Sequence, residues 1–88
     1  MDAVSEVKQA MKDGTAVLGL ERTMKLLRQN KVKKIFIASN TSKPTKEDIM
    51  HYSSIAQVPV EQLKLTNEDV GTMCKKPFSI SVISVRAE

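Results

Sequence analysis

Three short segments of this sequence carry groups suited to contacting phosphates and unpaired bases. Gly19 begins a basic stretch containing Arg22 and Lys25, and a glycine turn that leads into a helix exposes backbone N–H groups to phosphate oxygens. Asn40 lies in a polar loop, where its amide can both donate to and accept from a base. Residues 75–78, Lys-Lys-Pro-Phe, combine two cations with an aromatic ring suited to stacking. Each signal is weak by itself.

Each segment also has a purely structural interpretation, which the sequence leaves open. Gly19 could serve only to make a tight turn, and Lys25 could be a solvated surface cation. Phe78 could equally be the first core residue of a final strand. A binding function therefore depends on whether the fold brings the three segments together.

The sequence shows no pattern typical of a catalytic or metal site. It contains no Walker loop, no Gly-x-Ser-x-Gly motif, no His-Glu-x-x-His pair and no Cys-x-x-Cys motif. The only histidine, His51, is expected on a helix, and the only cysteine, Cys74, is expected in the core. The acidic pairs at 47–48 and 68–69 are expected at helix starts, where carboxylates interact favourably with the helix dipole. We expect no enzyme activity, metal, cofactor or small-molecule substrate.

Composition and charge favour an anionic partner. The 88 residues are 41% hydrophobic and carry a net charge of +4, and a chain this short predicts one domain over residues 1–88. Residues 22–46 contain eight lysines and arginines and no carboxylate, which favours nucleic acid as the partner. No apolar run approaches the ~20 residues needed to span a bilayer, and no signal segment is evident, so we expect no membrane association and a cytoplasmic location.

Helical and strand patterns alternate along the chain. Apolar spacing and turn residues predict helices over about 3–12, 20–30 and 46–57, and a short helix capped by Thr66 or Asn67. They predict strands over about 15–18, 34–38, 58–65 and 79–85. Thr45 and Asp48 resemble a capping box for the third helix. The alternation predicts an α/β fold, a three-layer α/β/α sandwich with a central four-stranded mixed sheet. The strand directions, which decide whether the three segments share one edge, stay open.

Four segments, in the same order, resemble the kink-turn-binding ribosomal proteins. Residues 17–27 are similar to the family's Gly-x-x-x-Thr-x-Lys helix, and residues 35–40 to its strand followed by asparagine. Residues 48–53 are similar to its third helix, and residues 70–78 to its last loop. The Gly-Thr-x-Cys segment, the Lys-Pro-Phe and the single asparagine look most like a large-subunit branch of archaea and eukaryotes.

The resemblance implies a structural constituent of the large ribosomal subunit that binds an rRNA kink-turn or internal loop, beside neighbouring large-subunit proteins. It implies RNA contacts from Gly19, Leu20, Arg22, Lys25, Asn40, Lys75, Lys76, Phe78 and Ile80. Phe78 would pack on an unpaired base and Ile80 would add an apolar contact. Lys75 departs from the family, which usually has glycine there. We expect RNA contact from Arg22 before Glu21, because a carboxylate repels phosphate.

Other functions are compatible with parts of the sequence. The nearest alternative is a kink-turn-binding core protein of an RNA-modification ribonucleoprotein. An enzyme would depend on His51 or Cys74, whereas a protein-interaction adaptor would keep its partner when Lys25 and Asn40 are replaced. RNA-binding preference therefore separates these functions.

Overall fold

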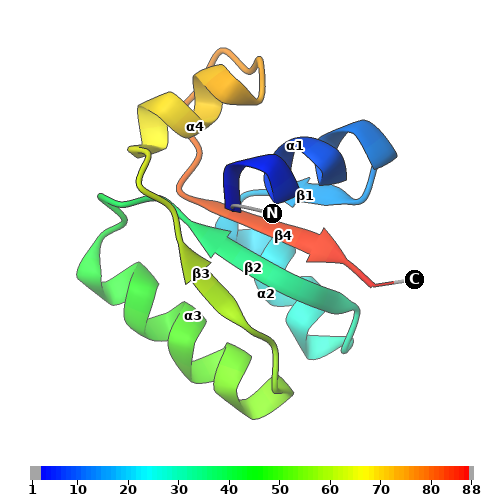
Figure 1. Cartoon of the computed structure of the whole chain (residues 1–88). Helices are drawn as coiled ribbons and strands as arrows, with labels where there is room; N and C mark the ends of the chain where they lie inside the picture. The colour runs from blue at the N-terminus through cyan, green and yellow to red at the C-terminus, as the bar shows by residue number, and fades with distance from the viewer. Residues whose placement is uncertain (1–2, 88) are drawn as a thin grey trace.

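Four helices and four strands alternate along residues 3–87, the part of the chain described by the structure, a computed structural model. In order they are α1 (Ala3–Asp13), β1 (Ala16–Leu18), α2 (Leu20–Arg28), β2 (Val32–Ile37), α3 (Lys43–Ala56), β3 (Val60–Gln62), α4 (Asn67–Met73) and β4 (Val82–Arg86). α1 and α4 lie on one side of the sheet, and α2 and α3 on the other (Figure 1). The predicted α/β/α sandwich is confirmed.

The strand directions place three loops at one edge of the sheet. The strand order is β1-β4-β2-β3, with β2 parallel to β3 and β4 antiparallel to both of its neighbours. The ends of β1, β2 and β3 therefore lie at the same edge as the start of β4. This edge, called here the loop edge, carries the Gly19 turn, the Asn40 loop and residues 75–81.

The central strands supply both cores because successive side chains of a strand point to opposite faces. On β2, Phe36 faces the α1 and α4 side, whereas Ile35 and Ile37 face the α2 and α3 side. The first cluster contains Val7, Phe36, Ala38, Leu63, Val70, Cys74, Ile80 and Ile83. The second contains Leu27, Val32, Ile35, Ile37, Ile49 and Val82. Cys74 is buried, as predicted for a lone cysteine without a metal-ligand pattern.

The start of α3 differs from the prediction. The helix begins at Lys43, with Ser42 as N-cap and a proline in the first turn, whereas the sequence predicted a start near residue 46 and a capping box from Thr45. The capping-box prediction is wrong because proline was interpreted as the end of the loop, although its fixed φ and missing N–H suit the first helical turn equally well. The earlier start extends α3 toward the loop edge.

The two acidic pairs consequently have different environments. Residues 47–48 lie inside α3 beyond its first turn, so their interpretation as helix-start carboxylates is wrong. Residues 68–69 do lie in the first turn of α4, where the Thr66 side chain accepts a hydrogen bond of 3.3 Å from the Asp69 N–H. The helix-dipole interpretation is therefore confirmed for the second pair alone.

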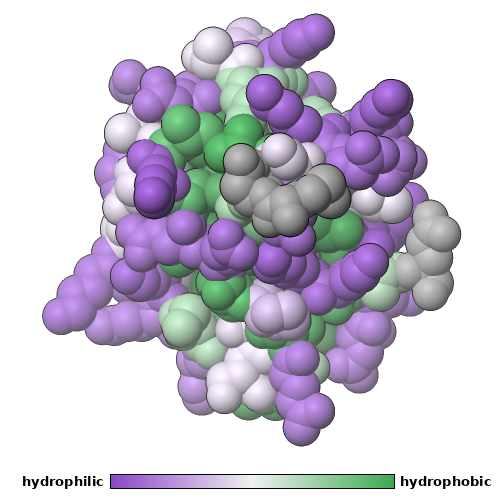
Figure 2. All heavy atoms as spheres, in the orientation of Figure 1, coloured by the Kyte–Doolittle hydropathy of each residue, from purple (hydrophilic) through white to green (hydrophobic). Residues whose placement is uncertain are grey.

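Two strands are also shorter or later than predicted. β3 covers Val60–Gln62 and not 58–65, and β4 begins at Val82 and not at residue 79. The Ile80 N–H donates to the Asn67 carbonyl at 3.0 Å, so the chain before β4 is bonded to α4 rather than to a neighbouring strand. The face seen in Figure 1 is mostly hydrophilic, with apolar atoms visible in gaps between the polar side chains (Figure 2). No helix within residues 3–87 is long and apolar enough to cross a membrane.

Candidate nucleic-acid interface

The Gly19 turn leaves the N-terminus of α2 open to a ligand. Gly19 has φ 103° and ψ 155°, a conformation that L side chains rarely adopt. No atom lies within 4 Å of the position a Cβ would take, so the backbone angle and not crowding requires glycine. Its N–H donates to the Val82 carbonyl at 2.9 Å, which fixes the turn to the start of β4. The open side permits a phosphate to approach the first turn of α2.

A buried polar contact holds α2 against the sheet beneath this turn. The Thr23 hydroxyl donates to Ser84 Oγ at 3.0 Å, and Ser84 Oγ donates to the Val17 carbonyl at 3.5 Å. Both side chains are fully buried, and buried hydroxyls need such partners to offset the loss of water. In the sequence, Thr23 is the threonine of the Gly-x-x-x-Thr-x-Lys pattern, and its bond to Ser84 was not predicted. Its observed role is to fix α2 relative to β1 and β4.

A hollow of about 910 Å³ lies at the loop edge, between the first turn of α2 and the chain before β4. The predicted contact residues that line it are Gly19, Leu20, Arg22, Lys76, Phe78 and Ile80. Met11, Thr45 and Arg86 also line it and were not predicted. Their proximity depends on the earlier start of α3 and on the packing of α1 and β4, for which the local sequence carries no signal. The hollow joins two of the three segments singled out in the sequence.

The side chains of Phe78 and Ile80, which both line this hollow, differ greatly in their exposure. Phe78 is 56% exposed, so its ring is available for stacking, and the alternative of a core strand residue does not hold. Ile80 is 3% exposed and packs in the core cluster under α4. Little of the Ile80 side chain can therefore reach a ligand in this conformation.

Asn40 is exposed at the loop edge, but its amide is already partly occupied. Its Nδ2 donates to Asn67 Oδ1 at 2.9 Å, and its Oδ1 accepts from the Asn67 backbone N–H at 2.8 Å. An asparagine amide has two donor hydrogens and two acceptor lone pairs, so one of each is left for a ligand. The sequence indicated Asn67 merely as a possible helix cap, because its pairing with Asn40 arises from the tertiary fold.

Lys25 and Lys75 lie outside the residues that line the hollow. Lys25 is exposed further along α2. Lys75 lines a separate hollow of about 370 Å³ with residues of α1 and the end of α4, among them Lys8 and Lys12. The structure therefore does not bring all nine predicted residues to one surface.

Lys75 follows α4, two residues after Met73, and has a left-handed backbone conformation with φ 59°. Its N–H donates to the Thr72 carbonyl at 3.0 Å, and the Lys76 N–H donates to the Gly71 carbonyl at 2.9 Å. These two bonds form a Schellman motif, in which glycine is the usual residue at the left-handed position. The resemblance had marked this position as a departure, and the backbone gives the physical reason why glycine is favoured there.

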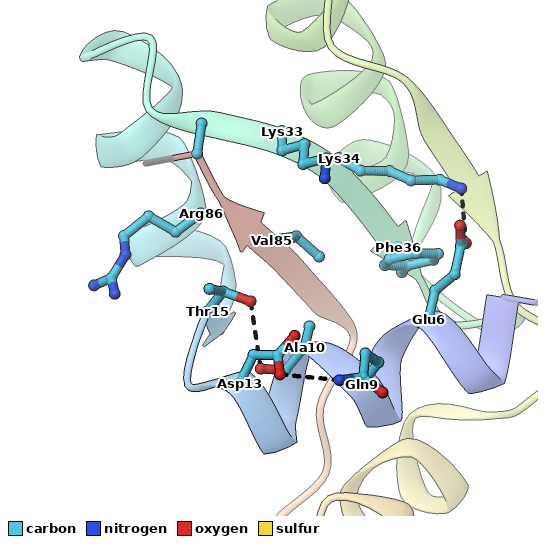
Figure 3. Close-up of a pocket in the computed structure, with 11 residues that line it drawn as sticks. Glu6, Gln9, Ala10, Asp13, Thr15, Lys33, Lys34, Phe36, Val85 and Arg86 are labelled. Atoms are coloured by element: carbon cyan, nitrogen blue, oxygen red, sulfur yellow. Dashed lines mark hydrogen bonds and ion pairs between the residues drawn. The ribbon is translucent and has the colours of Figure 1, made fainter.

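A third hollow, of about 710 Å³, lies between α1 and the sheet and has a different character (Figure 3). Lys34 Nζ lies 2.8 Å from Glu6 Oε2, 3.1 Å from Glu61 Oε1 and 4.9 Å from the Phe36 ring centroid. Hydrogen bonds to Glu6 and then to Glu61 raise the pKa of Lys34. None of the predicted RNA contacts lines this hollow. These ion pairs connect α1, β2 and β3.

Cys74 and the acidic residues form no recognisable reactive centre in the described part of the chain. Burial raises the pKa of the Cys74 thiol, against a smaller opposing effect of Lys76, so little thiolate is present at neutral pH. Within residues 3–87 no cluster of three or more His, Cys, Asp or Glu could hold a metal ion.

Comparison with known proteins shows similarity over nearly the whole chain. Residues 1–88 match the ribosomal protein L7Ae/L30e/S12e/Gadd45 family. The large ribosomal subunit protein eL30 of Saccharolobus solfataricus is 40% identical over 80 residues, which are 91% of this chain and 74% of that protein. The eL30 protein of Methanocaldococcus jannaschii is 32% identical over 88 residues, which are 100% of this chain and 80% of that protein. The sequence-based resemblance is confirmed, including its large-subunit branch.

Solved structures support the fold. The Giardia lamblia 15.5kD RNA binding protein matches with a TM-score of 0.80 and 16% identity, over 100% of this chain and 78% of that one. A Bacillus halodurans protein of unknown function matches with a TM-score of 0.84 and 20% identity, over 94% of this chain and 82% of that one. At such identities the likeness concerns the fold alone.

Proposed function

Because the chain belongs to the ribosomal protein L7Ae/L30e/S12e/Gadd45 family, we infer that it is an RNA-binding structural constituent of the large ribosomal subunit and not an enzyme. The observation that carries this inference is the 40% identity to an eL30 protein over 91% of the chain. The same identity favours the ribosome over an RNA-modification particle. We further propose that residues 1–88 act as one RNA-binding domain, with rRNA and neighbouring large-subunit proteins as partners and the cytoplasmic ribosome as location.

The RNA element that we propose is a kink-turn or internal loop, bound at the loop edge. An A-form duplex hides its base edges in a deep groove, whereas a bent internal loop exposes unpaired bases. The exposed Phe78 ring suits stacking on such a base, and the remaining donor and acceptor of Asn40 suit its edge. The α2 N-terminus, Arg22 and Lys76 are suited to the adjoining phosphates.

We expect Lys25, Lys75 and Ile80 to contribute less to RNA binding than the residues at the centre of the interface. Lys25 and Lys75 would meet phosphates that continue beyond the hollow, because both are exposed and cationic. Ile80 would mainly support the chain that carries Phe78, since its side chain is buried. The proposed interface is therefore centred on Gly19, Arg22, Asn40 and Phe78.

The test compares binding to a kink-turn RNA and to a straight duplex of equal length over a range of salt concentrations. Wild type should prefer the kink-turn, and Phe78→Ala should reduce that preference about 10-fold, because base–aromatic stacking contributes about 1–3 kcal/mol. Asn40→Ala should also reduce it. Ile55→Ala, a matched loss of an exposed apolar side chain on α3, should leave it unchanged. Equal, purely salt-dependent binding of wild type to both RNAs would contradict the proposed target.

A further inference from the structure

We propose that Asn67 is a positioning residue for RNA recognition, which fixes how Asn40 presents its amide to the RNA. The inference rests on the proposed RNA-binding function and adds a residue that need not touch the RNA. Asn67 is the first residue of α4 and is partly buried beside the exposed Asn40. Its contacts reach two of the segments that make up the proposed interface.

The first contact sets the polarity of the Asn40 amide. The Asn67 N–H donates to Asn40 Oδ1 at 2.8 Å, and Asn67 Oδ1 accepts from Asn40 Nδ2 at 2.9 Å. If the Asn40 amide turned over, its nitrogen would face the Asn67 N–H and its oxygen would face Asn67 Oδ1. Both contacts would become repulsive, so the pair permits one orientation. The remaining N–H hydrogen and the remaining oxygen lone pair of Asn40 therefore each point in a fixed direction.

The Asn67 side chain is itself held in place by the helix that it begins. Its Oδ1 also accepts from the Glu68 N–H at 2.9 Å, one of the donors that a helix start leaves without an intrahelical partner. A surface asparagine without such bonds would sample several rotamers and lose that freedom on binding. The Asn40–Asn67 pair removes this freedom before RNA arrives.

The second contact connects Asn67 to the chain that carries Phe78. The Asn67 carbonyl accepts from the Ile80 N–H at 3.0 Å, two residues beyond Phe78. One turn further along α4, a Cβ on Gly71 would overlap the Phe78 carbonyl oxygen, so the two backbones pack directly together. Through these contacts α4 fixes the Asn40 loop relative to the chain that carries Phe78.

The backbone around Asn40 has independent support, which makes a side-chain test meaningful. The Ser39 N–H donates to the Leu65 carbonyl at 2.8 Å, and Gln62 Nε2 donates to the Ser39 carbonyl at 3.2 Å. Removing the Asn67 side chain leaves these bonds and the Asn67 backbone bonds in place. The expected defect is a less firmly held Asn40 amide, which keeps the bond from the Asn67 N–H but loses the bond to Asn67 Oδ1, and not displacement of its loop.

The experiment measures the ratio of affinities for kink-turn RNA and straight duplex, together with the free energy of unfolding. Asn67→Ala should lower the ratio about 2- to 5-fold, which is part of the effect of immobilising one side chain, because the Asn67 N–H still bonds Asn40 Oδ1. Asn67→Asp should keep most of the preference, because a carboxylate oxygen still accepts from Asn40 and from the Glu68 N–H. Its added negative charge weakens binding to both RNAs and cancels in the ratio.

Thr66→Ala is the matched control. It removes the cap bond to the Asp69 N–H and destabilises the same helix start, but leaves Asn40 and its partner unchanged. The ratio should therefore stay at the wild-type value although the free energy of unfolding falls. An equal loss of the ratio in Thr66→Ala and Asn67→Ala would assign the effect to helix stability and overturn the proposal.

The double variant Asn40→Ala/Asn67→Ala separates action through Asn40 from a direct RNA contact. If Asn67 acts through Asn40, the double variant loses no more of the ratio than Asn40→Ala alone. Additive losses would overturn the positioning role. An unchanged ratio in Asn67→Ala, with loss in Asn40→Ala, would overturn this inference and leave the proposed function standing. Absence of kink-turn preference in wild type would overturn both.

Discussion

Lys75 has a left-handed backbone conformation that costs a non-glycine residue free energy. In the Schellman motif at the end of α4, its φ of 59° is maintained by the hydrogen bonds of residues 75 and 76. The left-handed region costs about 1–2 kcal/mol for an L residue with a Cβ. Lys75 therefore lowers stability at a position beside the proposed interface, where a cation could meet phosphate.

Replacing Lys75 with glycine should stabilise the protein. The relief of left-handed strain should exceed the extra entropy of glycine in the unfolded chain, which is about 0.4–1 kcal/mol, so the net gain should be up to about 1 kcal/mol. Urea unfolding measures the change. Lys76→Gly is the matched control, because its φ is not among the positive values and it should destabilise slightly. A loss of stability in Lys75→Gly equal to that in Lys76→Gly would contradict the strain argument.

At the level of single residues, the sequence singled out several side chains that the fold brings to the hollow at the loop edge, but not their surroundings. Gly19 and Arg22 could be identified because a glycine turn and a cation are evident in the sequence, whereas the exposure of Phe78 was left open until the fold was known. Asn67 could not, since a residue at a helix start has a sufficient local role as a cap. Its pairing with Asn40 depends on how two loops 27 positions apart meet.

α4 is the element on which the geometry of the proposed interface depends most. It is a short helix, Asn67–Met73, yet its first residue bonds the Asn40 loop and its middle packs on the chain before β4. Short helices are marginal by themselves, so α4 must gain its stability from these tertiary contacts. Disturbing its packing should therefore affect both folding and RNA recognition.

Gly71→Ala should move the chain that carries Phe78. The added Cβ would overlap the Phe78 carbonyl oxygen, which is backbone and cannot rotate away, so we expect a loss of about 1–3 kcal/mol in unfolding free energy. Denaturant unfolding and the kink-turn to duplex affinity ratio are the measurements, and both should decrease. Thr72→Ala, the exposed neighbouring position, should change the unfolding free energy by less than about 0.5 kcal/mol. If Gly71→Ala left both the unfolding free energy and the affinity ratio unchanged, the close packing of Gly71 on Phe78 would not be required for stability or recognition.

The type and order of all eight elements were predicted correctly, whereas several boundaries were not. Apolar spacing identified α1 and α2 because each buries one stripe against the sheet. The start of α3 was placed about three residues late, since Pro44 fits both a loop end and a first helical turn. The start of β4 was placed too early because Ile80 is apolar and buried, although its N–H bonds α4.

At the scale of the whole molecule, Lys34 connects α1 to the sheet across the side opposite α2 and α3. Its ammonium group lies between Glu6 of α1 and Glu61 of β3. Figure 3 shows the Lys34–Glu6 ion pair. The three side chains are 25%, 33% and 46% exposed, so solvent screening limits their contribution to stability. Because these ion pairs require a protonated Lys34, their contribution to the free energy of unfolding falls at alkaline pH.

Lys34→Met should lower the unfolding free energy by about 0.2–1 kcal/mol near pH 7, because methionine keeps an apolar stem over Phe36 but loses both ion pairs. Since the pKa of Lys34 is raised above its ordinary 10.5, its stabilisation is fully present below that pH. It is lost as the pH rises through the higher folded-state value. Wild type and variant should therefore converge in strongly alkaline solution. A difference that persists there, measured against Lys33→Met, would contradict the electrostatic origin.

The arrangement of the three segments could not be predicted without the strand directions. Alternating helices and strands predicted the layers, but β4 could have run parallel or antiparallel to β2. The antiparallel pairing of β4 with β2 brings residues 75–81 to the same edge as Gly19 and Asn40. The opposite direction would have placed Phe78 at the far edge, so the site depends on one pairing that local sequence does not determine.

That pairing also bears on how the protein is made. β4 comes last among the strands but lies between β1 and β2 in the sheet. Before its residues are synthesised, β1 has no neighbour in the sheet, and the N–H groups of Gly19 and Ala38 lack the Val82 and Ser81 carbonyls that they bond in the finished fold. A nascent chain emerges with its N-terminus first, so its early cations become available well before the loop edge is complete. Selective recognition would therefore begin when translation has supplied the last strand, and unfinished chains would not compete for the same RNA.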